Sequence, residues 1–122
     1  MQVTIEFDKN KLTSFLEAKL FHEDVFDAQT RVKIVQETSF GKEDSTLLAL
    51  LAEDEAETIR EIVALNENTP PETLDELSFD DSAKVRKALA LNPNISEELL
   101  EDLADDEDLE VREAVLGISS EK

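Results

Sequence analysis

Residues 77–103 read LSFDDSAKVRKALALNPNISEELLEDL, and residues 51–77 read LAEDEAETIREIVALNENTPPETLDEL. The two segments align without a gap at a step of 26 residues, and residues 103–122 continue the pattern as far as they go. Three rows of positions carry the period: Leu51, Leu77 and Leu103; Asp54, Asp80 and Asp106; and Arg60, Arg86 and Arg112. A fixed period of this length is the signature of a tandem repeat.

Each unit predicts two short helices. The first covers residues 59–63, 85–89 and 111–115, where apolar residues at i, i+3 and i+4 form one stripe. The second follows Thr69-Pro70 in one unit and Ser96 in the next, with Thr69 and Ser96 as expected N-caps and Pro70 at the first helical position. Neighbouring units must stack to cover their apolar faces. We therefore predict an all-α fold, an α-solenoid of stacked short helix pairs.

The ends of the first helix are also predicted. Asp54 and Glu57 have the spacing of a capping box. Asn66 and Asn92 stand where this helix should stop, and asparagine tolerates the left-handed conformation that is common there.

The strings Val85-Arg86-Lys87-Ala88-Leu89-Ala90-Leu91-Asn92-Pro93 and Leu103-Ala104-Asp105-Asp106 resemble the leucine-rich repeat variant family of bacterial proteins. They are also similar to short HEAT-like repeats. The resemblance covers about residues 45–118 and implies alternating helices in a curved stack that serves as a binding platform. One type of member carries an iron–sulfur cluster in a cysteine-bearing segment, a feature that this cysteine-free chain does not share. Gly117-Ile118 departs from the pattern, so the third unit is interpreted as a capping repeat.

Charge and aromatic content divide the chain into two segments. Residues 1–42 hold six basic and seven acidic side chains and five of the six phenylalanines. Residues 43–122 hold six basic and 24 acidic side chains, a net charge of −18. We interpret residues 1–42 as an aromatic-rich N-terminal cap or degenerate repeat and residues 43–122 as an acidic repeat array, together in one compact domain.

The first segment leaves two interpretations open. Val3, Ile5 and Phe7 alternate with polar residues, which is typical of a short β-strand. Residues 9–21 have helical spacing, and residues 31–36 fit either a helix, which we favour, or a strand paired with residues 2–7. An unpaired N-terminal strand could also join two copies of the chain in a homodimer.

Motifs for catalysis, cofactors and metals are missing from the sequence. The chain has no cysteine, and its single histidine, His22, has no second histidine for a zinc site. Gly41-Lys42 lacks the rest of a phosphate loop, and residues 105–110 lack the glycine of a calcium loop. We expect no enzyme activity, no cofactor and no metal site. With neither a signal-peptide pattern nor a membrane-length apolar run, we also expect a cytoplasmic location and no membrane contact.

Two sets of charged residues recur with the period. The first set is expected to form structural ladders between units, with arginine donating to a carboxylate or a carbonyl: Asp54, Asp80, Asp106, Arg60, Arg86 and Arg112. The second set is an acidic stripe on the second helices and beyond, which is the candidate partner-binding surface: Glu72, Asp75, Glu76, Glu98, Glu101, Asp102, Asp105 and Asp106. Between Glu97 and Glu110, nine of 14 residues are acidic and none is basic. A solvated outer face is the alternative interpretation of this stripe.

Such a negative surface repels nucleic acid and anionic membranes and attracts basic surfaces. The leading hypothesis is therefore a non-enzymatic protein-binding module that engages a basic partner protein without touching nucleic acid directly. One alternative is a nucleic-acid mimic that inhibits a DNA- or RNA-binding protein, of the anti-restriction or anti-CRISPR type. The other alternative is a structural or assembly protein.

Overall fold

The computed structural model describes the backbone of residues 8–120 and the side chains of residues 8–117. Over this range the chain forms eight α-helices and one 3₁₀ turn, and no β-strand. The elements are α1 (Lys9–Glu17), α2 (Ala28–Gln36), η1 (Lys42–Asp44), α3 (Ser45–Leu51), α4 (Glu57–Leu65), α5 (Pro71–Leu77), α6 (Ala83–Ala90), α7 (Glu97–Ala104) and α8 (Leu109–Ser120). The expected strand at residues 2–7 lies outside the described residues.

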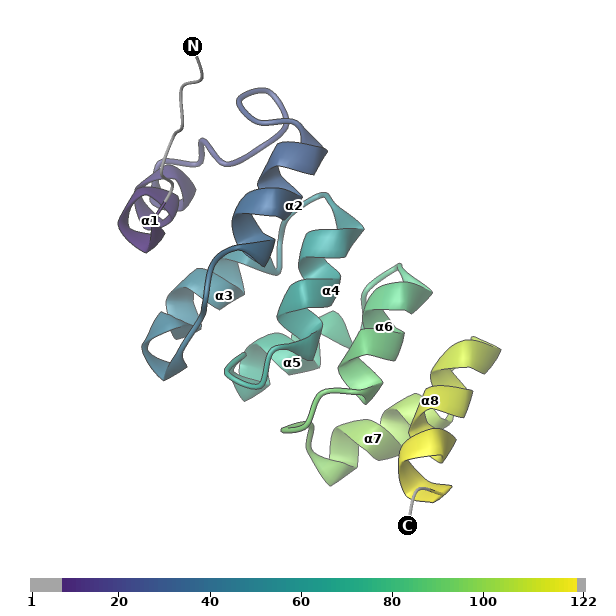
Figure 1. The fold of residues 1–122 in the computed structure, drawn as a ribbon. Helices are drawn as coiled ribbons and strands as arrows, with labels where there is room; N and C mark the ends of the chain where they lie inside the picture. The colour runs from purple at the N-terminus through teal and green to yellow at the C-terminus, as the bar shows by residue number, and fades with distance from the viewer. Residues whose placement is uncertain (1–7, 121–122) are drawn as a thin grey trace.

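The helices stack in two layers (Figure 1). Helices α2, α4, α6 and α8 lie side by side in one layer, which we call the first layer, and each contacts the next. Helices α1, α3, α5 and α7 form the second layer. In this layer, α3, α5 and α7 each contact the first-layer helix that follows them in the chain. This alternation of layers along one axis is an α-solenoid, as the repeat predicts.

The core runs through the stack because the same repeat position is buried in each unit. Ile59, Val85 and Val111 are fully buried at one position of α4, α6 and α8. Leu51, Leu77 and Leu103 are buried at the ends of α3, α5 and α7. Burying one such side chain contributes about 1.5–3 kcal/mol, so the merged rows of aliphatic residues supply most of the stability.

The N-terminal part of the stack is helical at residues 31–36, for which the sequence allowed either a helix or a strand. Residues 31–36 lie in α2, which packs against α4, so the helix is confirmed over the described backbone. The first helix ends at Glu17 rather than at Phe21, because Lys19 adopts a left-handed conformation with φ 60°. Leu20 N–H donates to the Phe15 carbonyl across this turn at 2.8 Å, the bond of a Schellman motif. The chain then reverses and Phe21 joins the core.

Of the three expected N-terminal caps, one is confirmed and two are wrong. Ser96 caps α7 as predicted, since its hydroxyl accepts from Leu99 N–H at 3.1 Å. Helix α4 starts after Ala56 without a side-chain cap, because the Asp54 carboxylate accepts from Ala56 N–H and from an arginine instead. Helix α5 starts at Pro71, so Pro70 is its N-cap rather than its first helical residue. Thr69 is not the cap, because its buried hydroxyl donates to the Val63 carbonyl at 2.6 Å.

Helix α4 stops with Asn66 as its C-cap, as predicted, and α6 ends at Ala90, two residues before Asn92. The left-handed conformation expected at these stops is wrong. Asn66 is extended, with φ −74° and ψ 127°, and Lys19 is the residue with positive φ in the described part of the chain. Both Asn66 and Asn92 instead use their side-chain oxygens to accept a backbone N–H two residues ahead, from Asn68 and Asn94. This local bond turns the chain without a left-handed residue.

Candidate functional site

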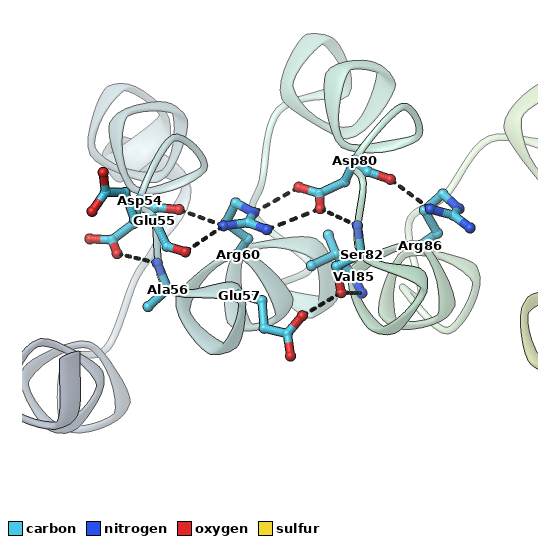
Figure 2. A network of polar contacts seen from close by, with 9 residues as sticks. All are labelled: Asp54, Glu55, Ala56, Glu57, Arg60, Asp80, Ser82, Val85 and Arg86. Carbon is cyan, nitrogen blue, oxygen red and sulfur yellow. Dashed lines mark hydrogen bonds and ion pairs between the residues drawn. The ribbon is translucent and has the colours of Figure 1, made fainter.

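A chain of arginine–aspartate contacts runs along one edge of the stack, at the start of the first-layer helices. Arg60 lies on α4, and its Nε and Nη2 donate to the two carboxylate oxygens of Asp80, at 2.7 and 3.2 Å, in the loop before α6. Its Nη1 donates to the carbonyl of Asp54 at 2.8 Å, in the loop before its own helix (Figure 2). One guanidinium therefore holds the loops of two successive units together.

The contact recurs one unit later. Arg86 donates from Nε and Nη2 to Asp106 at 2.8 and 3.2 Å and from Nη1 to the Asp80 carbonyl at 2.6 Å. Arg112 donates from Nη1 to the Asp106 carbonyl at 2.6 Å, and no carboxylate of a further unit faces it in the part of the chain that the structure describes. Among the described residues, Arg112 is therefore the last arginine of the arginine–aspartate ladder.

Arg31 begins the ladder and was missed by the sequence analysis. It is 1% exposed, and its Nε and Nη2 donate to the Asp54 carboxylate at 3.1 and 3.0 Å. It follows its N-cap, Asp27, by four residues, as Arg86 follows Ser82. The step from Arg31 to Asp54 is 23 residues, three more than the step from Arg60 to Asp80. This irregular step hid the equivalence, although the distance from the N-cap could have revealed it.

The aspartates of the ladder also order the loops. The carboxylates of Asp54, Asp80 and Asp106 accept the backbone N–H two residues ahead at 2.8, 2.9 and 2.8 Å. Burial on its own would raise the pKa of Asp106, but the hydrogen bonds from Arg86 and from the Asp108 N–H outweigh it, and the pKa is lowered. The hydrogen bond with Asp106 in turn raises the pKa of Arg86. The Asp106 carboxylate is thus held in its ionised form.

Asparagines tie the units together at the other end of the same helices. The amide Nδ2 of the buried Asn92 donates to the carbonyls of Ala64 and Asn66, at 2.7 and 2.9 Å, in the preceding unit. Nδ2 of Asn68 donates to the Phe40 carbonyl at 2.9 Å, and Nδ2 of Asn94 to the Glu67 carbonyl at 2.6 Å. Both edges of the stack therefore carry a repeated polar contact between units.

The structure divides the predicted partner-binding set in two. Seven of its residues are exposed: Glu72, Asp75 and Glu76 on α5, Glu98, Glu101 and Asp102 on α7, and Asp105 after α7. The eighth, Asp106, has a side chain only 8% exposed and is held by Arg86. It belongs to the ladder, so its carboxylate is not free to meet a partner.

The remaining candidates have ordinary structural roles. Nδ1 of His22 accepts from the Asp24 N–H at 3.2 Å at the surface. Gly41 and Lys42 lie at the start of η1, where the Gly41 N–H donates to Asp44. Across the described residues, no three carboxylate or imidazole side chains gather as metal ligands. None of the helices described is long and apolar enough to cross a membrane.

These contacts define the class of protein: an α-solenoid whose units are joined by repeated polar side chains. Residues 57–82 and 83–108 each match the family model of the Leucine rich repeat variant, so these two adjacent segments are tandem repeats of that kind. Each matched unit spans one first-layer helix and one second-layer helix, α4 with α5 and α6 with α7. Comparison with curated proteins and with solved structures found no match. Repeats of this family are generally protein-interaction modules.

Proposed function

We propose that the protein is a non-enzymatic binding module whose acidic second-layer surface engages a basic partner protein. The proposal is carried by the exposure of six carboxylates on two helices that have no basic residue. We call this surface the acidic face: Glu72, Asp75 and Glu76 of α5, with Glu98, Glu101 and Asp102 of α7.

The basic side chains of the repeats do not offset this charge, because they lie elsewhere. The guanidinium groups of Arg60 and Arg86 are committed to Asp80 and Asp106 in the ladder. Lys84 and Lys87 stand on α6 in the other layer, 3.8 Å from Glu57 and 3.4 Å from Glu110. The field of the acidic face is therefore open to a partner's cations, which would speed encounter and make binding sensitive to salt.

Folding explains only part of the acidic face, because Glu72 and Glu98 stand in the first turns of α5 and α7, where the helix dipole favours a carboxylate. Glu72 and Glu76 are four residues apart on α5, and Glu98 and Asp102 repeat the spacing on α7. Like charges at this spacing cost a few tenths of a kcal/mol per pair. The cost recurs in consecutive units, and the other four carboxylates of the acidic face lie beyond the first turn of their helices, which supports a function in recognition.

Two charge-matched variants test the proposal. In the first, the six residues of the acidic face are changed from Glu to Gln or from Asp to Asn. In the second, six exposed carboxylates elsewhere are changed in the same way: Glu17, Glu23, Asp24, Glu37, Glu67 and Glu113. Both variants have the same net charge, so they differ only in where the charge was removed. Each is immobilised beside the wild type and exposed to lysate at low salt, and bound proteins are eluted with rising salt and identified.

We expect the wild type and the second variant to retain the same proteins rich in Lys and Arg, and the acidic-face variant to lose them. Equal retention by both variants, or a neutral partner that survives high salt, would contradict the proposal. The two alternatives give different results. A partner of a nucleic-acid mimic would be displaced by added duplex DNA or RNA, and an assembly protein would sediment as a dimer or larger without a partner.

A further inference from the structure

Phe79 is the most exposed large apolar side chain among the described residues, at 86%. It lies in the loop between α5 and α6, beside Asp80 of the ladder. The equivalent positions in the neighbouring units are Glu53 and Asp105, both exposed and acidic. The repeat therefore favours a charged residue at this position. Phe79 replaces it, and the exposed ring takes no part in the hydrophobic core.

Exposed carboxylates surround Phe79 along this edge. A shallow hollow on one side of the ring is lined by Glu53, Glu55 and Asp81, and one on the other side by Asp81 and Glu107. Each hollow also includes a ladder arginine, Arg60 or Arg86, that is already committed to an aspartate. We call this surface the Phe79 edge: Phe79 with Glu53, Glu55, Asp81, Asp105 and Glu107.

The backbone next to the ring is held by two ladder arginines, which both bind Asp80. The Asp80 carboxylate accepts from Arg60 and from the Ser82 N–H, and its carbonyl accepts from Arg86 (Figure 2). The loop backbone is therefore ordered before binding, and a partner has only the two side-chain torsions of Phe79 left to fix. Aromatic side chains, phenylalanine among them, are enriched at the core of protein interfaces.

We propose that the Phe79 edge is the anchor point of the interface, and that it inserts the Phe79 ring into an apolar pocket rimmed by Lys and Arg on the partner protein. The inference rests on the proposed function and adds to it a defined contact and a chemical description of the partner. Charge complementarity determines the basic rim of the partner's pocket, because four exposed carboxylates, those of Glu53, Glu55, Asp81 and Glu107, line the hollows beside the ring. A partner arginine can also stack on the exposed face of the ring.

The absence of tryptophan and tyrosine from the chain allows a direct optical test. Phe79→Trp places a single indole at the edge, and Leu65→Trp places one at the opposite end of α4, where Leu65 is also exposed. Two synthetic peptides of equal charge serve as probes, one alternating Lys and Leu and the other alternating Lys and Ser. We expect the Lys–Leu peptide to shift the emission of the Phe79→Trp variant to shorter wavelengths and to shield it from iodide. The Leu65→Trp variant should not change, and an equal response of both would overturn the inference.

The affinities of the two peptides for alanine variants give a second test. Phe79→Ala leaves the net charge unchanged, and we expect it to weaken binding of the Lys–Leu peptide about tenfold. Binding of the Lys–Ser peptide should not change, and Leu65→Ala should bind both peptides as the wild type does. Because the ring is exposed, the melting temperature of Phe79→Ala should match the wild type, which separates a binding effect from misfolding.

The outcomes distinguish this inference from the proposed function. If Phe79→Ala binds the Lys–Leu peptide like the wild type while the acidic-face variant loses both peptides, the anchor is wrong and the acidic module stands. If the acidic-face variant and its charge-matched control bind both peptides equally well, the proposed function fails.

Discussion

Arg86 and Asp106 belong to successive repeat units, yet Nε of the arginine lies 2.8 Å from Oδ2 of the aspartate, and their side chains are only 10% and 8% exposed. The same guanidinium also binds the Asp80 carbonyl of its own unit. Arg31, Arg60 and Arg86 each couple nearest neighbours in the stack in this way. In a solenoid, such coupling is what makes separate units unfold together.

Removal of an internal ladder arginine should cost more stability than removal of the last one. Arg86→Gln leaves the buried Asp106 carboxylate without its cation, so we expect a loss of about 3–5 kcal/mol. Arg112→Gln removes the bond to the Asp106 carbonyl and should cost about 1 kcal/mol. Urea denaturation followed by circular dichroism measures both. Equal losses would mean that the ladder does not couple the units.

Acid should weaken the contact between Arg86 and Asp106. The pKa of Asp106 is lowered in the folded protein from the ordinary value of 3.8, so its ionised form stabilises the fold above that value. This contribution is lost as the pH falls through the lowered pKa. The difference in unfolding free energy between wild type and Asp106→Asn should therefore be constant from pH 7 to about 5 and shrink below 3.8. A difference that grew on acidification would contradict the assignment.

Substitution of an asparagine that bonds to another unit should cost more stability than substitution of one that bonds only within its own loop. Asn92→Ala leaves the carbonyls of Ala64 and Asn66 without their donor, and we expect a loss of about 2–4 kcal/mol. Asn66→Ala removes the bond from the Asn68 N–H within the same loop and should cost about 1 kcal/mol. Thermal unfolding by calorimetry gives the order, and the reverse order would refute this account.

The acidic face should destabilise the isolated protein at low salt. Removing its six charges should raise the unfolding free energy by about 1 kcal/mol at ~10 mM salt, since like charges three and four residues apart repel. At about 1 M salt the Debye length is about 3 Å, and the gain should nearly vanish. Urea titrations of wild type and variant at the two salt concentrations check this. A gain that persists in high salt would point to a change in helix propensity rather than in charge.

Some expectations failed because one residue type serves several local structures. Asp54 three residues before Glu57 has the spacing of a capping box, but its carboxylate is drawn to Arg31, 23 residues earlier in the chain. Asn92 follows a helix as a left-handed stop would, but its amide reaches back to the preceding unit. Both side chains accept a local N–H two residues ahead and also contact a neighbouring unit, and local spacing does not reveal the contact between units.

The candidate binding residues were predictable in part. The exposure of the carboxylates on α5 and α7 followed from the helical spacing of the leucines beside them. Asp106 was assigned both to the stripe and to the ladder, and the structure places it in the ladder. Phe79 carried no repeat signal, since it replaces an acidic residue at one position of one unit.

The amino-acid sequence alone determined the repeat, the two-helix unit and the aliphatic rows, because burial in a helix follows a period that can be read along one dimension. The tertiary structure alone decided which carboxylate each arginine meets, that Arg31 starts the ladder, and that the Phe79 ring faces water. These depend on the offset between neighbouring units, a distance in space that packing sets and that no local pattern specifies.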